Sequence, residues 1–406
     1  MTVLAIIDAT RIEAPQGPAT QVAGLSLVER AIRLASVCGT DHIIVHIEEG
    51  ESPPTFDSSI VEKEVTFWTK SDQPPDVSAD RILIMDAGVV FQRSFVSQVV
   101  ADSAEIEPGS SLRDAQGYLA ILAPPGMHSL QSILSDPSQA LAEARPALSG
   151  GWAELINSEE AIHRASRRLW NGCRKPQDGL VSRYLNRHIS ISISRVLVST
   201  AVRPNHISAL TLSMGVAAAL VAAWGGYLGF LFAGVLYQIN SVVDGVDGEL
   251  ARVRYEFSVT GEWLDTISDD MADLLLYIGL GVGAWRTMPE APGPFGSELW
   301  LILGLVAAAG KIASMIVYYR WLIAHGRGDL LAFEWSFKDD SDDNHQPRSA
   351  LSRALSATHY FFRKDFIVFV AMILSFGGFL PHLLFALAPG NIIVALSVMI
   401  QQLRRP

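Results

Sequence analysis

Four aspartates stand at spacings that could build one acidic site. Asp244 and Asp247 are three residues apart, and Asp265 and Asp269 are four apart, so each pair shares one helix face. Both pairs lie at the ends of long apolar segments, where four uncompensated carboxylates would repel one another. A divalent cation would remove that repulsion, and hard oxygen ligands suit Mg²⁺ or Mn²⁺. We therefore predict a metal site with all four aspartates as ligands.

Small and basic residues accompany the first aspartate pair. Gly248 and Ala251 fall on the carboxylate face of the same predicted helix, where their small size leaves room for a bulky ligand. Arg252 offers a forked donor that suits a phosphate group. The stretch from 244 to 269 thus predicts a site for a phosphate-bearing ligand.

The composition indicates a membrane protein. Hydrophobic residues make up 49% of the 406 residues and charged residues only 18%. A formal net charge of −11 excludes a nucleic-acid partner, because no basic surplus is available to neutralise phosphates. Cys38 and Cys173 are far apart and are expected as free thiols. Residues 1–8 lack a basic region and a long apolar run, so we expect no signal peptide.

Residues 1–160 have the pattern of a soluble α/β domain. Val3–Ile7, His42–Ile47 and Arg81–Met85 are apolar or β-branched runs typical of buried strands, and Ser26–Val37 has helical periodicity. Strands that alternate with helices predict a parallel sheet with crossover helices.

Three segments of this domain resemble the sugar-phosphate nucleotidyltransferases. Gly24–Arg30 (GLSLVER) is similar to the G-x-P-L-x-E-R segment of that family, Asp86 to its metal-binding aspartate, and Trp152–Glu160 to its closing W-x-D-V-D-T-x-E-D. Two departures weaken the implied activity. Asp8–Pro15 replaces the glycine-rich loop whose amides hold a triphosphate, and the closing aspartates are Glu154 and Ile156. We expect a degenerate nucleotidyltransferase-like domain with a structural or regulatory role.

Residues 161–203 form a basic linker, which contains a predicted amphipathic helix at the membrane interface, beginning near Asp178. Positive charge ahead of a first span marks the cytoplasmic side and suits lipid headgroups. An alternative is that one or two of these side chains contact a substrate phosphate. The basic residues are Arg164, Arg167, Arg168, Arg174, Lys175, Arg183, Arg187 and Arg195.

Residues 204–406 are expected to form an α-helical membrane domain. No Asp, Glu, Lys or Arg occurs from Pro204 to Val243, and Gly225-Gly226 near the middle predicts two spans joined by a tight turn. About six transmembrane helices are expected, the other four at 261–285, 299–323, 366–379 and 384–400. Asp329–Ala357 is expected to be a solvated loop, because it lacks the glycine and the closing glutamate of a calcium loop.

The distribution of charge predicts the topology. With six spans both termini lie on one side, and the basic residues Arg252, Arg254, Arg320, Arg327, Arg404 and Arg405 fall on that side. We expect a multi-pass protein of a bacterial or archaeal inner membrane with cytoplasmic termini. Tyr227 lies about 25 Å from Asp244 along an ideal helix, which puts the aspartates at the cytoplasmic rim of the lipid bilayer.

The spacing of the acidic stretch is similar to a known pattern. Residues 244–269 match D-x₂-D-G-x₂-A-R-x₈-G-x₃-D-x₃-D at every fixed position, as in the CDP-alcohol phosphotransferases (also called CDP-alcohol phosphatidyltransferases). The resemblance covers about residues 178–403. It implies that Asp244, Asp247 and Asp265 hold Mg²⁺ or Mn²⁺, and that Asp269 is the general base that also touches a second metal.

The same resemblance implies the rest of the site and the partners. Pro204-Asn205-His-Ile-Ser208 is similar to the family's P-N-x-x-T, so Asn205 and Ser208 would face the CDP group. The family uses a CDP-alcohol donor such as CDP-diacylglycerol or CDP-inositol and an alcohol acceptor, releases CMP, and tends to form homodimers. The expected substrate-binding residues are Asn205, Ser208, Gly248, Ala251, Arg252, Ser258 and Gly261.

The order of the domains resembles bifunctional enzymes with inositol-1-phosphate cytidylyltransferase and di-myo-inositol phosphate phosphate synthase activities. The segments Asp178–Arg183 (DGLVSR) and Arg363–Asp365 (RKD) are similar to that branch. Lys311, Arg320 and Arg363 are candidates for binding the phosphate of a phosphorylated polyol acceptor. Cytoplasmic anchoring is the alternative role of Arg320 and Arg363, whereas Lys311 lies deeper in its span.

These patterns leave several hypotheses. The first is a CDP-alcohol phosphotransferase with a vestigial front domain, acting in phospholipid or polyol phosphodiester synthesis. The second is the true bifunctional inositol-phosphate enzyme, and the third is a non-catalytic membrane scaffold. An ion-coupled transporter would keep its acidic residues near the midplane of the bilayer, within internal repeats, whereas these aspartates are expected at one edge of the bilayer. Release of CMP from a CDP-alcohol would distinguish the enzyme hypotheses from the scaffold hypothesis.

Overall fold

The computed structural model describes residues 1–54, 56–73, 75, 77, 79–107, 109–123, 130–175, 178–288, 294–330, 333 and 363–404. The chain forms two compact units. Unit 1 comprises Met1–Cys173, Arg195–Thr200 and Leu250–Glu256, and unit 2 comprises Arg174–Ser194, Ala201–Glu249 and Phe257–Pro406. Most of the predicted solvated loop over Asp329–Ala357 lies outside the described residues. The predicted domain boundaries at 160 and 203 remain a proposal.

Unit 1 is built on a seven-stranded sheet with the order β10-β8-β9-β6-β1-β4-β5. The strands are β1 (Val3–Asp8), β4 (His42–His46), β5 (Glu64–Trp68), β6 (Arg81–Asp86), β8 (Ser111–Asp114), β9 (Leu119–Leu122) and β10 (Arg145–Leu148). The predicted parallel pairing is found between β1 and its neighbours β4 and β6, and between β4 and β5. Strand β9 is antiparallel to β6 and β8, so the sheet is mixed rather than parallel. The reason is the short connection between β8 and β9, which allows only a hairpin.

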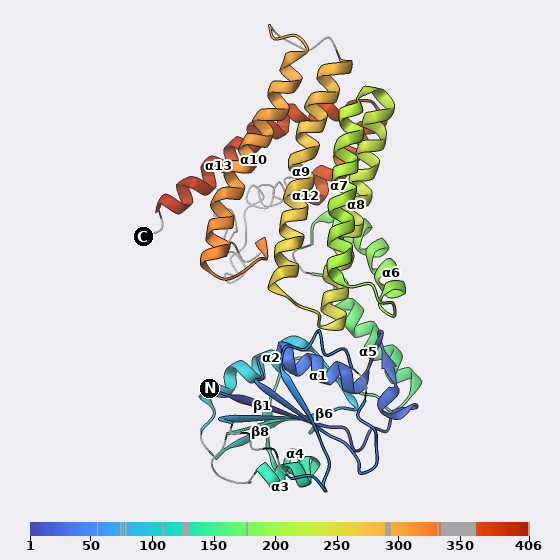
Figure 1. The fold of residues 1–406 in the computed structure, drawn as a ribbon, viewed down its shortest axis with the longest axis vertical. Helices are drawn as coiled ribbons and strands as arrows, with labels where there is room; N and C mark the ends of the chain where they lie inside the picture. Colours follow the sequence, from blue (N-terminus) through green and yellow to red (C-terminus); the bar gives the residue numbers. More distant parts are fainter. Residues whose placement is uncertain are drawn as a thin grey trace, which may run out of the picture. The chain divides into compact units, whose positions relative to one another are not determined.

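Helices cover both faces of this sheet, which explains why all six residues of β1 are buried. Figure 1 shows α1 (Leu27–Val37) and α2 (Arg93–Asp102) on one face, and α3 (Leu130–Ser135) and α4 (Pro137–Glu143) on the other. Ser26 caps α1 by accepting a hydrogen bond from the Glu29 amide at 3.3 Å. Short elements complete the unit: β2 (Gln21–Val22), β3 (Leu25–Ser26), β7 (Val89–Phe91), β11 (Ala153–Leu155), α5 (Glu159–Asn171) and 3₁₀ turns at Gly17–Ala19 and Ser103–Glu105.

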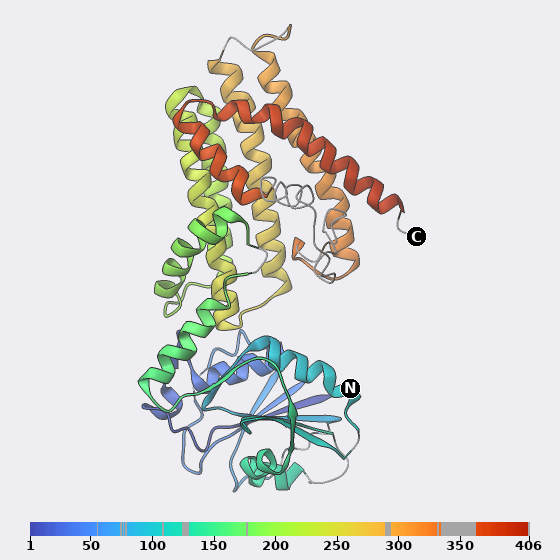
Figure 2. The ribbon, with the colours of Figure 1, turned by 180° about the vertical axis from the view of Figure 1, so that it is seen from behind.

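Unit 2 is helical. Its long helices are α7 (Pro204–Trp224), α8 (Gly226–Arg254), α9 (Val259–Thr287), α10 (Glu298–Ala324) and α13 (Leu384–Arg404). Shorter elements are a π-helical turn (Ser182–Asn186), α6 (Arg187–Leu197), α12 (Lys364–Phe376) and a 3₁₀ turn (Leu380–Leu383). Seen from behind in Figure 2, α12 and α13 lie in front of α8 and α10.

The turn between α7 and α8 is the one predicted. Gly225 and Gly226 have φ of 80° and 67°, a left-handed conformation that side-chain-bearing residues avoid. A β-carbon on Gly225 would also lie 2.6 Å from the Gly283 carbonyl oxygen. The two glycines therefore allow α8 to turn back sharply after α7.

Four of the described helical segments are long and apolar enough to cross a membrane: Pro204–Trp224, Gly226–Arg254, Glu298–Ala324 and Leu380–Leu403. The predicted number was about six. The predicted span at 261–285 is a helix, α9, but its first half carries several acidic residues. The predicted span at 366–379 is α12, whose 13 residues reach only about 20 Å.

Small residues let α7 and α9 pack closely. A β-carbon on Gly215 would lie 2.5 Å from the Ala272 β-carbon, and one on Gly283 would overlap the Ala222 carbonyl. Helix α9 packs against α10 on another side, and α10 packs against α13. Close backbone approach through small residues is typical of helices in membranes. This packing holds α9, and with it the second aspartate pair.

Candidate active site

The four predicted aspartates gather in unit 2. Asp244 and Asp247 lie on α8, and Asp265 and Asp269 lie on α9. The negative charges of the other three act on Asp244, and those of Asp247 and Asp269 act on Asp265. The two helices thus bring together carboxylates that are up to 25 residues apart in sequence.

The start of α7 and the start of α9 join this group. Ser208 on α7 donates a hydrogen bond of 2.7 Å to Asp247 Oδ2. A β-carbon on Gly261 would lie 3.0 Å from Asn205 Oδ1, so glycine is needed for the close approach of α7 and α9 at this point. Ser258 caps α9 by accepting a hydrogen bond of 3.0 Å from the Gly261 amide. The structure therefore brings Asn205, Ser208 and Gly261 to the aspartates and gives Ser258 a capping contact.

The remaining predicted substrate-binding residues are on α8. Gly248 follows Asp247 directly, and Ala251 and Arg252 occupy the last turns of that helix. The Nε atom of Arg252 is buried and has no hydrogen-bond partner among the described residues. An unpaired buried N–H favours a ligand with an acceptor oxygen at this point.

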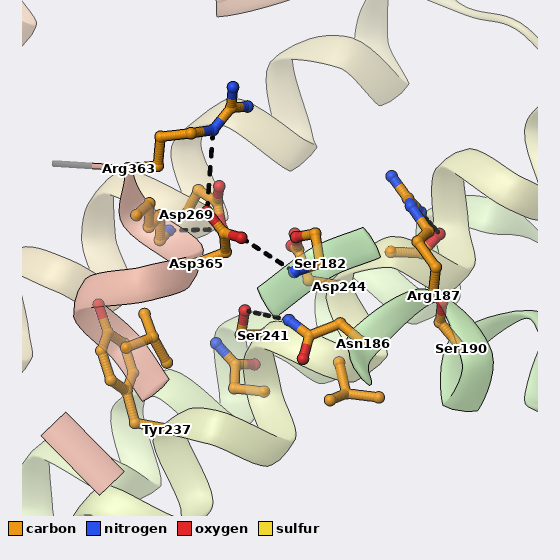
Figure 3. Close-up of a pocket in the computed structure, with 15 residues that line it drawn as sticks. Ser182, Asn186, Arg187, Ser190, Tyr237, Ser241, Asp244, Asp269, Arg363 and Asp365 are labelled. Atoms are coloured by element: carbon orange, nitrogen blue, oxygen red, sulfur yellow. Dashed lines mark hydrogen bonds and ion pairs between the residues drawn. The ribbon is translucent and has the colours of Figure 1, made fainter. Parts of the chain in front are cut away.

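A polar pocket of about 200 Å³ includes one aspartate from each pair, Asp244 and Asp269. Figure 3 shows the pocket, with side chains from the π-helical turn, α6, α8, α9 and α12 around it. The polar lining residues are Ser182, Asn186, Arg187, Ser190, Tyr237, Asn240, Ser241, Asp244, Asp269, Arg363, Lys364 and Asp365. Residues from five elements converge here, although the lining residues are spread from Ser182 to Val368 along the chain.

Lys364 is a pocket residue to which the sequence analysis gave no role. Its Nζ lies 2.9 Å from Asp269 Oδ1 and 3.3 Å from Asp273 Oδ1. It follows Arg363, which the sequence did indicate as a candidate phosphate ligand. The signals in the sequence were its place in the RKD segment and at the start of a predicted apolar segment, and its partner could not be deduced from spacing.

The three candidate acceptor ligands have different surroundings. Arg363 lines the pocket, and its Nε lies 3.8 Å from Asp365 Oδ1. Lys311 lies outside the pocket lining, because its Nζ pairs with Asp270 at 2.8 Å and with Asp273 at 3.1 Å. Arg320 is exposed on α10 and is also not among the described lining residues. Of the three, only Arg363 is near Asp244 and Asp269.

Tyrosines complete the buried ion pairs behind the pocket. Tyr318 and Tyr319 donate hydrogen bonds of 2.6 Å and 2.9 Å to Asp270 Oδ2, and Tyr237 donates one to Asp273. A carboxylate inside a membrane helix is costly unless it is paired and hydrogen bonded, and Asp270 and Asp273 have both kinds of partner. This network fixes the face of α9 that carries Asp269.

Glu249, within the acidic motif, is completely buried. It accepts hydrogen bonds of 2.6 Å from both Ser190 and Ser194, and Arg187 Nη1 lies 2.8 Å from its Oε1. Arg187 also donates to both oxygens of Asp178, at 3.1 Å and 3.3 Å. The basic linker is therefore tied to the motif helix by a buried ion pair. Sequence analysis gave Arg187 a role at lipid headgroups and gave Glu249 none.

Two segments that resemble the bifunctional enzymes lie together. The backbone amide of Ser182 donates a hydrogen bond of 2.9 Å to Asp365 Oδ2. A β-carbon on Gly179 would overlap the carboxylate of Asp365, so a larger residue at that position would require the Asp365 side chain to shift. The segments 178–183 and 363–365 thus form one wall of the site, as Figure 3 shows for Ser182 and Asp365.

The donor chemistry of the four aspartates fits a hard divalent cation, because it offers carboxylate oxygens from two helices. Among the described residues, no group of three or more His, Cys, Asp or Glu side chains is already arranged as a metal site. The ammonium group of Lys364 supplies the positive charge beside Asp269.

The front domain has its own pair of carboxylates at the ends of two strands. Asp8 and Asp86 are register partners at the ends of β1 and β6. Asp86 accepts a hydrogen bond of 2.7 Å from the Gly88 amide, and burial raises the pKa of Asp86 to about 6. Asp8 accepts from the amide and the hydroxyl of Thr10 at 3.2 Å and 2.8 Å. The start of the loop after β1 is therefore held by the hydrogen bonds that Thr10 donates to Asp8.

Residues 201–374 match the model of the CDP-alcohol phosphatidyltransferase family. The matched residues lie in the C-terminal half of the chain, where the motif resemblance also lies. Its acidic motif and the Pro204–Ser208 segment both fall inside the matched residues.

Several curated proteins are similar to part of this chain. A bifunctional IPC transferase and DIPP synthase of Thermococcus kodakarensis is 36% identical over 163 residues, which are 40% of this chain and 34% of that protein. A protein of the same name from Rubrobacter xylanophilus is 39% identical over 151 residues, 37% of this chain and 31% of its own length. An archaetidylinositol phosphate synthase of Pyrococcus horikoshii is 28% identical over 92 residues, 22% of this chain and 47% of its own length. The chain spans about a third of the length of the bifunctional relatives it matches.

Solved structures aligned with this chain include a glucose-1-phosphate thymidylyltransferase of Bacillus anthracis and HddC of Yersinia pseudotuberculosis. Each has a TM-score of 0.27 and covers 41% of this chain. The first is 10% identical and is covered over 95% of its own chain, and the second is 12% identical and is covered over 99%.

Proposed function

We propose that this protein is a CDP-alcohol phosphotransferase, which transfers a substituted phosphate from a CDP-alcohol to an alcohol acceptor and releases CMP. The observation that carries the proposal is the convergence of Asp244, Asp247, Asp265 and Asp269 from two helices inside a domain of the matching family. The biological role would be synthesis of a phospholipid or a polyol phosphodiester.

The reaction forms one bond and breaks one. The acceptor hydroxyl oxygen attacks the phosphorus that carries the donor's alcohol, and the bond from that phosphorus to the bridging pyrophosphate oxygen breaks. The hydroxyl proton goes to Asp269, and the bridging oxygen leaves with CMP. Asp269 lines the pocket, where an acceptor hydroxyl could reach it.

Asp244, Asp247 and Asp265 are the residues that would hold Mg²⁺ or Mn²⁺, and Asp269 would share a second ion. A bound divalent cation supplies charge neutralisation for a doubly negative pyrophosphate. Ser208 orients Asp247 through its hydrogen bond. Asn205, Ser258, Gly261, Gly248, Ala251 and Arg252 would surround the CDP group.

The acceptor would enter the pocket beside Asp269. Arg363 and Lys364 lie together on its lining and would bind a phosphate group of the acceptor. In this arrangement Lys311 has a structural role, because it neutralises Asp270 and Asp273. Arg320 would then serve the alternative role of cytoplasmic anchoring.

The finer membrane arrangement is also part of the proposal. Four described segments meet the length and composition of a span. We infer that α9 and α12 complete a set of about six, with both termini cytoplasmic. A homodimer is expected from the family alone.

The front domain is proposed to be vestigial. Asp86 remains at the end of its strand, but the amide and hydroxyl of Thr10 hold Asp8 in a closed turn where a triphosphate loop would need glycines. The names of the bifunctional relatives favour a second candidate, in which this domain makes the CDP-linked donor. Incubation of the full chain with CTP and inositol 1-phosphate tests that candidate, because pyrophosphate release would establish it.

The proposed function is tested with purified protein in detergent, Mg²⁺, a panel of CDP-alcohols and a panel of alcohol acceptors. We expect CMP release with at least one pair, loss of release with a chelator, and recovery when Mg²⁺ or Mn²⁺ is restored. A membrane scaffold releases no CMP from any donor, so absence of release across the panel would contradict the proposal.

A further inference from the structure

Asn240 is a buried polar residue to which the proposed reaction gives no role. Its side chain is on α8, lines the pocket, and is only 4% exposed. Its Oδ1 atom has no hydrogen-bond partner among the described residues. A buried unsatisfied carbonyl costs about 1–3 kcal/mol, so its presence needs a reason.

Its neighbour Asn186 is used differently. Asn186 accepts a hydrogen bond of 2.9 Å from Gln238 and donates one of 3.3 Å to Ser241. Both ends of that amide are therefore fixed within the protein, and Figure 3 shows the contact with Ser241. Asn186 holds the pocket wall in shape, whereas the buried Asn240 oxygen has no partner among the described residues.

The position of Asn240 on α8 relates it to the chemistry. It lies four residues before Asp244, so the two side chains share one face of the helix about 6 Å apart along its axis. Both line the same pocket as Asp269 and Lys364. A molecule that places a hydroxyl at Asp269 and an anionic group at Lys364 would have its other atoms near Asn240.

The chemistry of the wall defines the ligand class. A carbonyl oxygen only accepts, so the missing partner must offer an O–H or N–H group. The pocket encloses about 200 Å³, below the volume of a typical drug-sized site, and its lining is mostly hydroxyls, amides and charged groups. These features suit a compact phosphorylated polyol and do not suit an acyl chain.

We propose that Asn240 accepts a hydrogen bond from a non-reacting hydroxyl of a phosphorylated polyol acceptor and so determines acceptor specificity. The inference rests on the proposed function and adds a residue to it. A site that hydrogen bonds a substrate hydroxyl rejects analogues without it, because the buried protein group is then left unpaired.

The test compares Asn240→Leu with the wild type. Leucine is close to asparagine in size but removes the acceptor oxygen. Binding of myo-inositol 1-phosphate and of inorganic phosphate is measured by calorimetry in detergent. We expect Asn240→Leu to weaken the polyol phosphate about tenfold or more, the effect of one hydrogen bond of about 1.4 kcal/mol or more, and to leave inorganic phosphate unchanged.

Kinetics and stability provide independent readouts. In Asn240→Leu the KM for the acceptor should rise while the KM for the CDP-alcohol stays the same. The melting temperature of this variant without ligand should equal or exceed that of the wild type, because an unsatisfied buried oxygen is removed. Ile239→Leu, at a 46% exposed neighbour, is the matched control and should match the wild type. If Asn240→Leu does not fold, Asn240→Ala, which also removes the acceptor oxygen, takes its place in every measurement.

Each outcome decides the inference. Equal weakening of both probes, or no weakening of either, would show that Asn240 does not recognise a hydroxyl. If the wild type releases CMP and Asn240→Leu has unchanged acceptor KM, the inference fails and the proposed function stands. If the wild type neither binds these probes nor releases CMP, both fail together.

Discussion

Two groups of carboxylates occur in this chain, and they differ in where their partners come from. In the front domain the hydrogen bonds that Asp8 and Asp86 accept come mainly from within two residues, from Thr10 and from the Gly88 amide, and His46 Nδ1 of β4 also lies 3.6 Å from Asp8 Oδ1. In the helical unit the partners come from other helices. Ser208 of α7 contacts Asp247, and Lys364 of α12 contacts Asp269.

The difference separates carboxylates that shape a loop from carboxylates that form a site. A carboxylate bonded by its own turn stabilises that turn and has little capacity left for a ligand. Carboxylates held by distant elements form a cavity wall, and their mutual repulsion can be relieved by a cation. Surviving acidic residues in the front domain are therefore weak support for catalysis there.

The sharpest test of this comparison replaces one aspartate in each group. Asp269→Asn should lower CMP release about 10²–10⁴-fold, because it removes the proposed general base. Asp86→Asn should leave CMP release unchanged. Activity is measured at saturating donor and acceptor, and a melting curve confirms that both variants fold. Equal loss in both variants would contradict the division of roles.

The next effect concerns the buried ion pair of the helical unit. Glu249→Ala removes the partner of Arg187 and of two serines, and breaking such a pair should cost about 3–5 kcal/mol of unfolding free energy. Glu249→Gln should cost less, because its carbonyl oxygen still accepts hydrogen bonds. Denaturant unfolding in detergent measures both. Glu298→Ala, at an exposed position, should change stability by less than about 0.5 kcal/mol.

A smaller effect is expected at Gly179. An alanine β-carbon would overlap the Asp365 carboxylate, so Gly179→Ala should destabilise by about 1–3 kcal/mol as the wall of the site shifts. Gly390→Ala is the matched control, because no atom lies within 4 Å of its β-carbon position. That variant should be neutral or stabilising, since alanine favours a helix. Similar melting of both variants would show that the wall at 179 is not tightly packed.

The smallest effect is a pH dependence in the front domain. The pKa of Asp86 is about 6 in the folded chain against 3.8 ordinarily, so the folded state binds more protons between these values. Stability should therefore fall as pH rises from about 4 to about 6. Asp86→Asn keeps an oxygen for the Gly88 amide and should reduce this slope, which is measured as the change in melting temperature between about pH 4 and about pH 6. Identical slopes for wild type and variant would contradict a raised pKa.

Periodicity and spacing in the sequence predicted the local features. The strands at 3–7, 42–47 and 81–85, the helix at 26–37 and the turn at Gly225-Gly226 are all present within a few residues. Each aspartate pair lies on a single helix, as the spacing predicted, because a helix fixes which residues share a face. Pairing across helices could not be predicted in this way. Nothing in the sequence joins Arg187 to Glu249, or Lys364 to Asp269, because those contacts depend on how the helices pack.

One expectation from the sequence was wrong, and another stays a prediction. The front sheet was expected to be parallel, but a hairpin makes β9 antiparallel. Lys311 was considered a phosphate ligand because a charge deep in a span suggests function. Its partners Asp270 and Asp273, on another helix, account for that charge without a ligand.

The ion pairs of α9 have a consequence for how the protein is made. Asp270 and Asp273 are on α9, but their lysine partners, Lys311 and Lys364, are on helices translated later. A lone helix with such acids enters a bilayer poorly, since each central aspartate costs about 2.5–3.5 kcal/mol at the translocon. We expect α9 to wait at the membrane surface until α10 arrives from the ribosome. The two helices would then enter together as a hairpin, and the site would be assembled only when α12 follows.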